Sequence, residues 1–229
     1  MRTVALIVAA GRAKRFGGDM PKQFREVCGR PLLSWTLSRF EAASAVDETV
    51  LVVAEEFLVF TQEKVVDPFD LHKVAKIVTG GEARQDSVRL GLKALSAATD
   101  LVAIHDGARP LVLASDIDQV IHAATAEGAA MLAVPIDDTL KKVRSGRVLS
   151  TVNRQSIYCA QTPQVFEYNT IRKLHAEASA GSVFTDDAGL AEQNGVTVAV
   201  VEPEGLNIKV TTQRDFQLVE MILKGEEDA

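Results

Sequence analysis

The sequence contains no hydrophobic stretch long enough to cross a membrane as a helix. Its longest clearly apolar run covers only residues 4–10, whereas a spanning helix needs ~20 residues. The run leads into a glycine and a basic loop, and not into the small-residue cleavage region of a secretory signal. We therefore expect a first β-strand here and no membrane partner.

Cysteine is also scarce. The two cysteines, Cys28 and Cys159, form no CxxC or Cys/His spacing. One disulfide would be an unusual staple for a chain of 229 residues, and disulfides belong mainly to secreted proteins. We therefore expect reduced cysteines that act as packing residues, in a cytoplasmic protein.

The sequence has no excess of positive charge. It contains 25 Lys and Arg against 31 Asp and Glu, which gives a net charge of -6, and no block of like charges. This balance argues against a duplex nucleic-acid or anionic-membrane partner, because both need a positive field. The 47% hydrophobic and 24% charged residues are typical of a soluble globular protein with a sizeable core. Without a flexible linker or a repeat, we expect a single domain over residues 1–229.

Short apolar runs alternate with helical patterns along the chain. The runs that predict buried strands are residues 3–9, 49–54, 74–78, 101–105, 130–134 and 196–201. Residues 85–97 show the clearest helical spacing, and further helices are expected at about 31–42 and 115–128. This alternation predicts an α/β fold with a doubly wound, mostly parallel, Rossmann-like sheet, whose ligands bind at the carboxyl ends of the strands.

One segment, residues 137–152, interrupts the alternation. It has two β-prone arms around Ser145-Gly146 and carries several basic side chains, which predicts a projecting antiparallel hairpin. Its charges are consistent with a simple solvated hairpin. Because no helix is available to cover Val143, Val148 and Leu149, we favour a dimerisation arm that packs on a second copy of the chain.

The first predicted strand ends in a small-residue turn, Ala9-Ala10-Gly11, followed by Arg15 and Lys22. Small residues let backbone N–H groups approach phosphate oxygens, and the cations neutralise their charge. The turn fits neither GxGxxG nor GxxxxGK[ST], which disfavours a dinucleotide dehydrogenase and a P-loop NTPase. A turn with a solvated basic loop is the alternative at this point.

Two further strands end in polar loops. Residues 79–87 follow one strand with the sequence TGGEARQDS, and residues 105–110 follow another with HDGARP. In a doubly wound sheet these loops converge on the edge that carries Arg15 and Lys22. Glycine backbone, cations and the Asp106 carboxylate together meet the needs of a nucleoside triphosphate with Mg²⁺.

These motifs resemble the 2-C-methyl-D-erythritol 4-phosphate cytidylyltransferases of the non-mevalonate isoprenoid pathway. The resemblance covers essentially the whole chain. Its motifs are AAGRAKRFGGDMPKQF at 9–24, GGEARQDSV at 80–88, HDGARP at 105–110, DT at 138–139, NR at 153–154, QTPQ at 161–164, TDD at 185–187 and NIKVT at 207–211. Such enzymes transfer CMP from CTP to methylerythritol phosphate and release pyrophosphate, with Mg²⁺ or another divalent cation bound with CTP.

The resemblance also implies roles for individual residues. The residues expected to contact the nucleotide are Ala9, Ala10, Gly11, Gly81, Glu82, Ser87, Asp106 and Gly107, with Asp106 also the candidate metal ligand. The catalytic candidates are Arg15, Lys22, Arg154 and Lys209. The residues expected to bind methylerythritol phosphate are Arg109, Thr139, Arg154, Thr162, Thr185 and Lys209. In the family, the positions of Thr139 and Arg154 reach into a neighbouring subunit's site, which implies a homodimer with shared sites.

The basic loop departs from the family pattern AAGxGxRM. Ala13 replaces its second glycine and Phe16 its methionine, and the methyl group of Ala13 limits close approach of the backbone to phosphate. Two other functions stay open: a ribitol-5-phosphate cytidylyltransferase, and a nucleotide-binding module without catalysis. A sugar-nucleotide pyrophosphorylase is less favoured, because the chain lacks further elements for the sugar.

For several polar residues, a structural role is an alternative to a functional one. His105 has no spaced partner and is expected to be hydrogen-bonded structure in preference to a metal ligand. Asp186 and Asp187 are expected to cap a helix and complement its dipole. Thr162 lies in a Thr-Pro-Gln segment that reads as a turn, and only the family resemblance makes it a ligand.

Overall fold

The computed structural model describes residues 1–11, 20–178 and 184–227. Its helices are α1 (Leu32–Ala42), α2 (Leu58–Thr61), α3 (Arg84–Ala94), α4 (Ala114–Glu127), α5 (Tyr168–Glu177), α6 (Asp187–Gln193) and α7 (Gln213–Glu227). Its strands are β1 (Thr3–Val8), β2 (Glu26–Val27), β3 (Arg30–Pro31), β4 (Glu48–Val53), β5 (Val74–Thr79), β6 (Leu101–Asp106), β7 (Ala129–Pro135), β8 (Lys141–Arg144), β9 (Arg147–Thr151), β10 (Tyr158–Glu167) and β11 (Ala199–Val201). No helix in these ranges is long and apolar enough to span a membrane.

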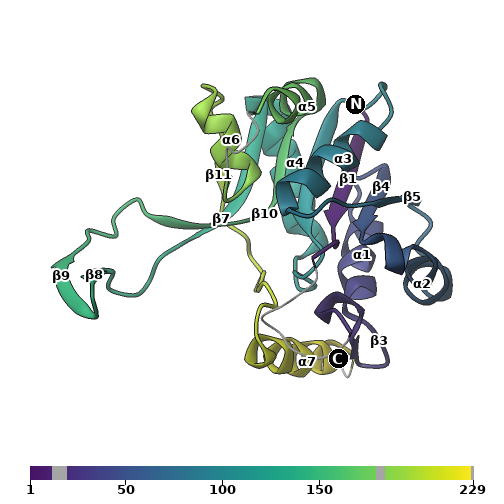
Figure 1. The fold of residues 1–229 in the computed structure, drawn as a ribbon, viewed down its shortest axis with the longest axis horizontal. Coiled ribbons are helices and arrows are strands. Elements are labelled where there is room, and N and C mark those ends of the chain that lie inside the picture. Colours follow the sequence, from purple (N-terminus) through teal and green to yellow (C-terminus); the bar gives the residue numbers. More distant parts are fainter. Residues whose placement is uncertain (12–19, 179–183, 228–229) are drawn as a thin grey trace.

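The main sheet has the order β11-β7-β10-β6-β1-β4-β5 (Figure 1). Strands β1, β4, β5 and β6 pair in parallel, and so do β7 and β11. Strand β10 runs antiparallel between β6 and β7. The prediction of a mostly parallel α/β sheet is confirmed, whereas β10, an antiparallel strand in the interior of the sheet, was not predicted.

The buried side chains on the two faces of the sheet follow the alternation along each strand. On β1, Ala5 and Ile7 join a core with residues of α1 and α4. Val4 and Leu6 point to the other face and pack with residues of α3, α5 and α6. Period-2 alternation therefore gives both faces of a central strand a helical layer to pack on.

A smaller apolar cluster lies beyond the carboxyl ends of the strands. It joins the hairpin β2–β3 and the start of α1 to α7 through Val27, Trp35 and Leu223, and Figure 1 shows α7 across that end of the molecule. Val210, just before α7, is fully buried in the same cluster. This packing fixes the segment that carries Lys209 beside the sheet edge.

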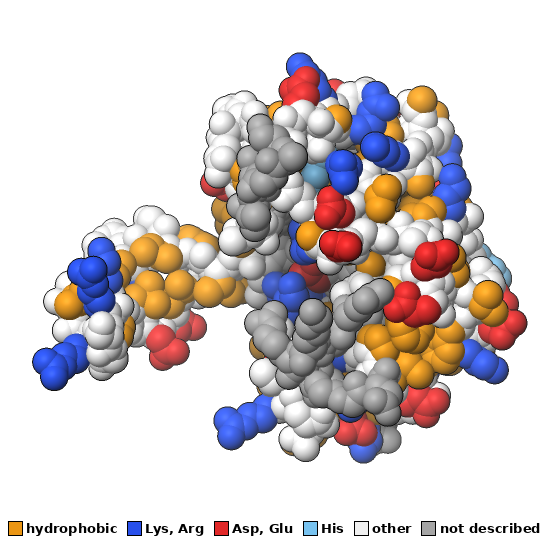
Figure 2. Space-filling model, viewed as in Figure 1, with side chains coloured by type: hydrophobic (Ala, Val, Ile, Leu, Met, Phe, Trp, Pro, Cys, Tyr) orange, Lys and Arg blue, Asp and Glu red, His pale blue; other side chains and the backbone are white. Residues whose placement is uncertain are grey.

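The predicted hairpin is confirmed as β8–β9, which pair with each other and form a separate two-stranded sheet. Ser145 and Gly146 have φ angles of 49° and 73°, as a two-residue type I′ turn requires. The hairpin projects from the body of the protein (Figure 1). Its apolar side chains are more than half exposed, at 56% for Val143, 63% for Val148 and 57% for Leu149, and Figure 2 shows hydrophobic side chains along this projection.

The expectation for the cysteines is wrong at one position. Cys28 is half-buried, but Cys159 is exposed because it lies on the part of β10 that extends from the core toward the arm. Neither cysteine forms a disulfide bond within the described residues.

Candidate active site

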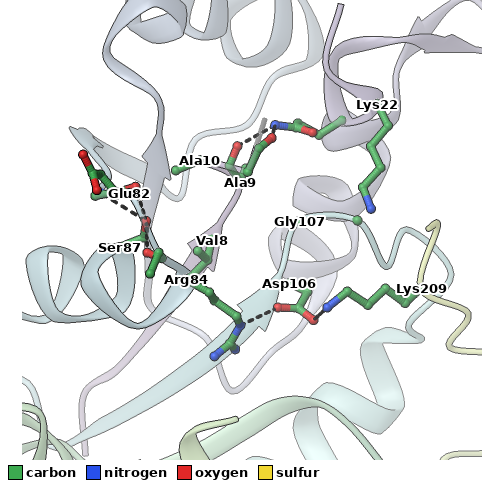
Figure 3. A pocket seen from close by; sticks show the side chains of 15 residues that line it. Val8, Ala9, Ala10, Lys22, Glu82, Arg84, Ser87, Asp106, Gly107 and Lys209 are labelled. Carbon is green, nitrogen blue, oxygen red and sulfur yellow. Dashed lines mark hydrogen bonds and ion pairs between the residues drawn. The ribbon is translucent and has the colours of Figure 1, made fainter. Parts of the chain in front are cut away.

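A cavity of about 330 Å³ opens at the carboxyl ends of β1 and β6 (Figure 3). The loops after β1, β5 and β6 meet there, as the topology of a parallel sheet requires. Its lining residues are Val8, Ala9, Ala10, Gly11, Lys22, Gln23, Gly81, Glu82, Ala83, Arg84, Ser87, Asp106, Gly107, Ala108 and Lys209. Ten of the residues predicted from the sequence are among them: Ala9, Ala10, Gly11, Lys22, Gly81, Glu82, Ser87, Asp106, Gly107 and Lys209.

The turn after β1 is held by Gln23, a residue for which no role was predicted. The buried Gln23 amide donates to the carbonyl oxygens of Ala9 and Gly11 at 2.7 and 2.9 Å. The Ala9 N–H donates to the Val52 carbonyl at 2.7 Å. These bonds fix the backbone of the turn while its small side chains keep the cavity open.

The loop after β5 closes tightly on this turn. A Cβ atom added at Gly80 would lie 2.4 Å from the Ala10 Cβ, so only glycine permits this approach. The Ser87 hydroxyl, in the first turns of α3, accepts a hydrogen bond from the Gly81 N–H at 3.1 Å. The predicted nucleotide residues Gly81 and Ser87 thus form one connected wall.

Asp106, the last residue of β6, is the charged centre of the cavity. One carboxylate oxygen accepts a hydrogen bond from Arg84 Nε at 3.0 Å, and the other accepts one from Lys209 Nζ at 2.6 Å. Figure 3 shows these two cations reaching Asp106 from opposite sides. Burial alone would raise the pKa of Asp106, but the charges of Arg84 and Lys209 outweigh it and hold this pKa well below its usual range.

His105 lies behind the cavity as a structural group, as predicted. Its Nδ1 lies 3.1 Å from the Thr162 hydroxyl, which also accepts the Asp106 N–H at 3.1 Å. The Arg109 carbonyl, 3.3 Å from Nε2, can only accept a hydrogen bond. The ring proton is therefore on Nε2, and the Thr162 hydroxyl donates to Nδ1. Complete burial lowers the pKa of His105 to about 3, so the ring is neutral.

A family model described as 2-C-methyl-D-erythritol 4-phosphate cytidylyltransferase matches residues 3–225. The chain belongs to this family. It is 44% identical over 227 residues to the 2-C-methyl-D-erythritol 4-phosphate cytidylyltransferase of Geotalea uraniireducens, and the match covers 98% of this chain and 97% of that protein. It is 43% identical over 228 residues to the protein of that name from Pelotomaculum thermopropionicum, with 99% and 96% covered.

A solved structure of 4-diphosphocytidyl-2C-methyl-D-erythritol synthase from Anaerococcus prevotii superimposes with a TM-score of 0.84. The two chains are 30% identical, and the match covers 97% of this chain and 96% of the other. A match to a "Bifunctional enzyme IspD/IspF" from Rhodospirillum rubrum, 44% identical over 229 residues, covers 98% of this chain but only 58% of that longer protein. As a member of the cytidylyltransferase family, the protein is an enzyme of the nucleotidyltransferase class.

The structure leaves some of the residues predicted for this cytidylyltransferase outside the cavity lining. Thr139, Arg154 and Thr185 are exposed, and the first two flank the projecting hairpin. Arg109 is buried, where its Nη1 donates to the Asn207 carbonyl at 2.7 Å and its Nε lies 3.9 Å from Asp106.

Thr162 is not the turn residue that the sequence suggested. It lies within β10, is 4% exposed and holds the Asp106 backbone from behind. Arg15, Ala13 and Phe16 lie outside the described residues.

Sequence reasoning missed Arg84 as well as Gln23. Arg84 is the first residue of α3 and lines the cavity beside Asp106. A cation at the N-terminus of a helix opposes the helix dipole. That local conflict is the signal that could have identified Arg84, because natural sequences break such rules mainly at functional sites.

The cavity offers little to a metal ion without a substrate. Within residues 1–11, 20–178 and 184–227, no group of three or more His, Cys, Asp or Glu side chains is arranged as a metal site. Mg²⁺, however, commonly binds through one or two carboxylates together with substrate phosphates. The ionised Asp106 carboxylate in the cavity fits that mode of binding.

Proposed function

We propose that this protein transfers CMP from CTP to 2-C-methyl-D-erythritol 4-phosphate, giving 4-diphosphocytidyl-2-C-methyl-D-erythritol and pyrophosphate. The observation that carries the proposal is the pairing of Arg84 and Lys209 with Asp106 in a cavity that Lys22 also lines, at the carboxyl ends of β1 and β6. Full-length membership of the cytidylyltransferase family supports the choice of substrates. We take residues 1–229 as one catalytic domain.

CTP would lie between the small-residue turn after β1 and the wall formed by Gly81 and Ser87. The backbone of Ala9, Ala10 and Gly11 would hold the phosphates, because small side chains allow N–H groups to approach them closely. Gly81, Glu82 and Ser87 would surround the base and ribose, and Asp106 with Gly107 would lie beside the phosphates. The hydrogen bonds from Gln23 to the β1 turn pre-organise this backbone before the nucleotide arrives.

The reaction joins two anions, and this fact decides what the side chains must do. A phosphate oxygen of the acceptor attacks the α-phosphorus of CTP in line, and pyrophosphate leaves. The attacking oxygen is already anionic near neutral pH, so no serine or cysteine nucleophile is needed. Catalysis then rests on positioning and on neutralising charge, which we assign to Lys22, Lys209, Arg15 and Arg154.

Mg²⁺, or another divalent cation, would be held by Asp106 together with the phosphates of CTP, and would supply further neutralisation of the triphosphate charge. Lys209 and Arg84 each pair with one oxygen of Asp106, so they keep the carboxylate ionised and in place. Lys22 reaches the Val210 carbonyl and lines the same cavity, so its ammonium group would lie near the triphosphate as a second neutralising charge.

The acceptor would be bound by residues around the cavity mouth and by a second copy of the chain. Within one chain these are Arg109, Thr162, Thr185 and Lys209. From the second copy, Thr139 and Arg154 would enter through the arm at 137–152 of a homodimer. The exposed Val143, Val148 and Leu149 support this assembly, since an isolated two-stranded hairpin is marginally stable in water. A cytoplasmic location stays a prediction.

The test measures pyrophosphate release with CTP and Mg²⁺, and compares 2-C-methyl-D-erythritol 4-phosphate with ribitol 5-phosphate as acceptor. We expect turnover with the first. Turnover with ribitol 5-phosphate alone would reassign the substrate, and CTP binding without turnover of either acceptor would indicate a nucleotide-binding module.

A further inference from the structure

Arg84 lies between two carboxylates, of which only one belongs to the cavity. Its Nε donates to Asp106 at 3.0 Å, and its Nη1 donates to Asp187 at 2.8 Å. Asp106 ends β6, whereas Asp187 begins α6 on the other side of Arg84. One planar guanidinium therefore connects the charged centre of the cavity to a carboxylate outside its lining.

Asp187 is itself fixed from two directions. It is 2% exposed, and its second carboxylate oxygen lies 2.9 Å from Nε2 of the buried His175 on α5. Its backbone N–H donates to the side-chain oxygen of Gln164 at 3.0 Å. Burial would raise the pKa of Asp187, but the hydrogen bond from His175 and the charge of Arg84 lower it, so the carboxylate is ionised.

Stability alone is a poor explanation for this arrangement. The Asp187 side chain is 2% exposed and that of Arg84 is 29% exposed, and an ion pair largely removed from water is often no more stabilising than apolar residues of similar volume, because the charges lose hydration. The third guanidinium nitrogen, Arg84 Nη2, is buried and has no hydrogen-bond partner among the described residues. Leaving a buried donor unpaired is destabilising, so hydrogen bonding within the described residues does not by itself account for the position of this group.

We propose that Asp187, held by His175, is a positioning residue that fixes Arg84 and, through it, the Asp106 carboxylate for nucleotide binding. The proposal rests on the proposed function, because it takes CTP as the ligand of the cavity. With Asp187 in place, Arg84 is shared between two carboxylates, one bound at Nε and the other at Nη1. Without it, the guanidinium is free to rotate and Asp106 loses one of its two fixed partners.

The test is a double-mutant cycle on CTP binding, measured by titration calorimetry with CTP and Mg²⁺ in the absence of acceptor. Asp187→Asn keeps the size of the side chain and removes its charge, and Arg84→Gln removes the guanidinium. We expect each to raise the Kd for CTP by about tenfold, which corresponds to ~1.4 kcal/mol. If Asp187 acts through Arg84, the double variant binds no more weakly than Arg84→Gln. Fully additive losses would overturn the proposal.

Two further variants separate positioning from folding. Asp118→Asn is the matched control, because Asp118 accepts hydrogen bonds from Ser44 and Ala45 and is absent from the cavity lining. It is expected to lower the melting temperature without changing the Kd for CTP. His175→Leu removes the donor to Asp187 and should weaken CTP binding. His175→Gln keeps an N–H donor for Asp187 and should retain most of the CTP affinity. Equal affinities for the two His175 variants would count against the relay from His175.

If Asp187→Asn does not fold, Arg84→Lys tests the same link. Lysine keeps the positive charge but cannot bridge two carboxylates as the guanidinium does, so CTP binding is expected to weaken about tenfold. Wild-type affinity in Arg84→Lys would overturn the proposal. Absence of CTP binding in the wild type would overturn both proposals, whereas CTP binding without turnover would count against the proposed function alone.

Discussion

Replacing Lys22 by alanine should separate charge stabilisation in the reaction from stability of the fold. The backbone at Lys22 is anchored by its neighbours, since Gln23 holds the β1 turn and Phe24 is 3% exposed in the core. The side chain itself donates to the Val210 carbonyl. A hydrogen bond from a charged group contributes about 1.5–3 kcal/mol, a loss that a fold stable by ~5–15 kcal/mol survives.

The Lys22→Ala variant is expected to stay folded but to lose most of its catalytic rate. One pre-organised group that stabilises developing charge is commonly worth ~2.7–4 kcal/mol of activation free energy. Lys22→Ala should therefore lower kcat by about 10²–10³-fold, measured as pyrophosphate release at saturating CTP and acceptor. Circular dichroism and a thermal melt would verify that the variant is folded under the assay conditions.

Lys73→Ala is the matched control for this measurement. Lys73 also donates to a backbone carbonyl, that of Ala43 at 2.6 Å, but is absent from the cavity lining. Its replacement should cost a similar amount of stability and leave kcat unchanged. A wild-type kcat in Lys22→Ala, or an equal loss in both variants, would remove Lys22 from the mechanism.

Three other outcomes are expected. Gln23→Leu removes the donor to Ala9 and Gly11, and should raise the KM for CTP by about tenfold with little change in the KM for the acceptor; an unchanged KM would show that the turn holds itself. Asp215 accepts hydrogen bonds from the N–H groups of Thr211 and Thr212, which outweigh burial and lower its pKa. The ionised carboxylate therefore stabilises the fold above its unfolded pKa of ~3.9, and this contribution is lost as pH falls through the lower pKa of the folded state. The melting temperatures of wild type and Asp215→Asn should differ at pH 7 and converge in acid. A difference in melting temperature that does not change with pH would contradict this. Shortening the arm to a turn between residues 139 and 152 should give a monomer with reduced activity, and a fully active monomer by light scattering would end the idea of shared sites.

Much of the fold could be predicted because its strands and helices carry their own signals. The parallel strands are short apolar runs, and α3 has a clear helical spacing, so each is visible within a window of a few residues. Strand β10 has no such signal. Pro163 lacks an N–H for the ladder and demotes the run to a turn, and the pairing of β10 with β7 shifts register between Ala160 and Gln164. Only contacts with β6 and β7 make this segment a central strand.

The same distinction applies to the site. The glycine turns and Asp106 lie at the ends of predicted strands, so topology alone brings them together. Gln23 and Thr162 act through hydrogen bonds to backbone groups that are distant in the sequence, and no local pattern specifies these partners. The relation of Arg84 to Asp187 spans 103 positions and is equally invisible in the sequence.

The net charge of -6 is compatible with anionic substrates because the cations converge at one place. Arg84, Arg109 and Lys209 all lie within 4 Å of Asp106. Burial and the nearby Arg84 lower the pKa of Arg109, although Asp106 opposes them. Holding cations this close costs free energy, because they lose hydration and repel one another. A cluster of apolar side chains in the same place would stabilise the fold equally well. The arrangement therefore makes sense as a site prepared for additional negative charge, which the phosphates of CTP and of the acceptor would bring, while the acidic excess elsewhere disfavours binding of these anions to the rest of the surface.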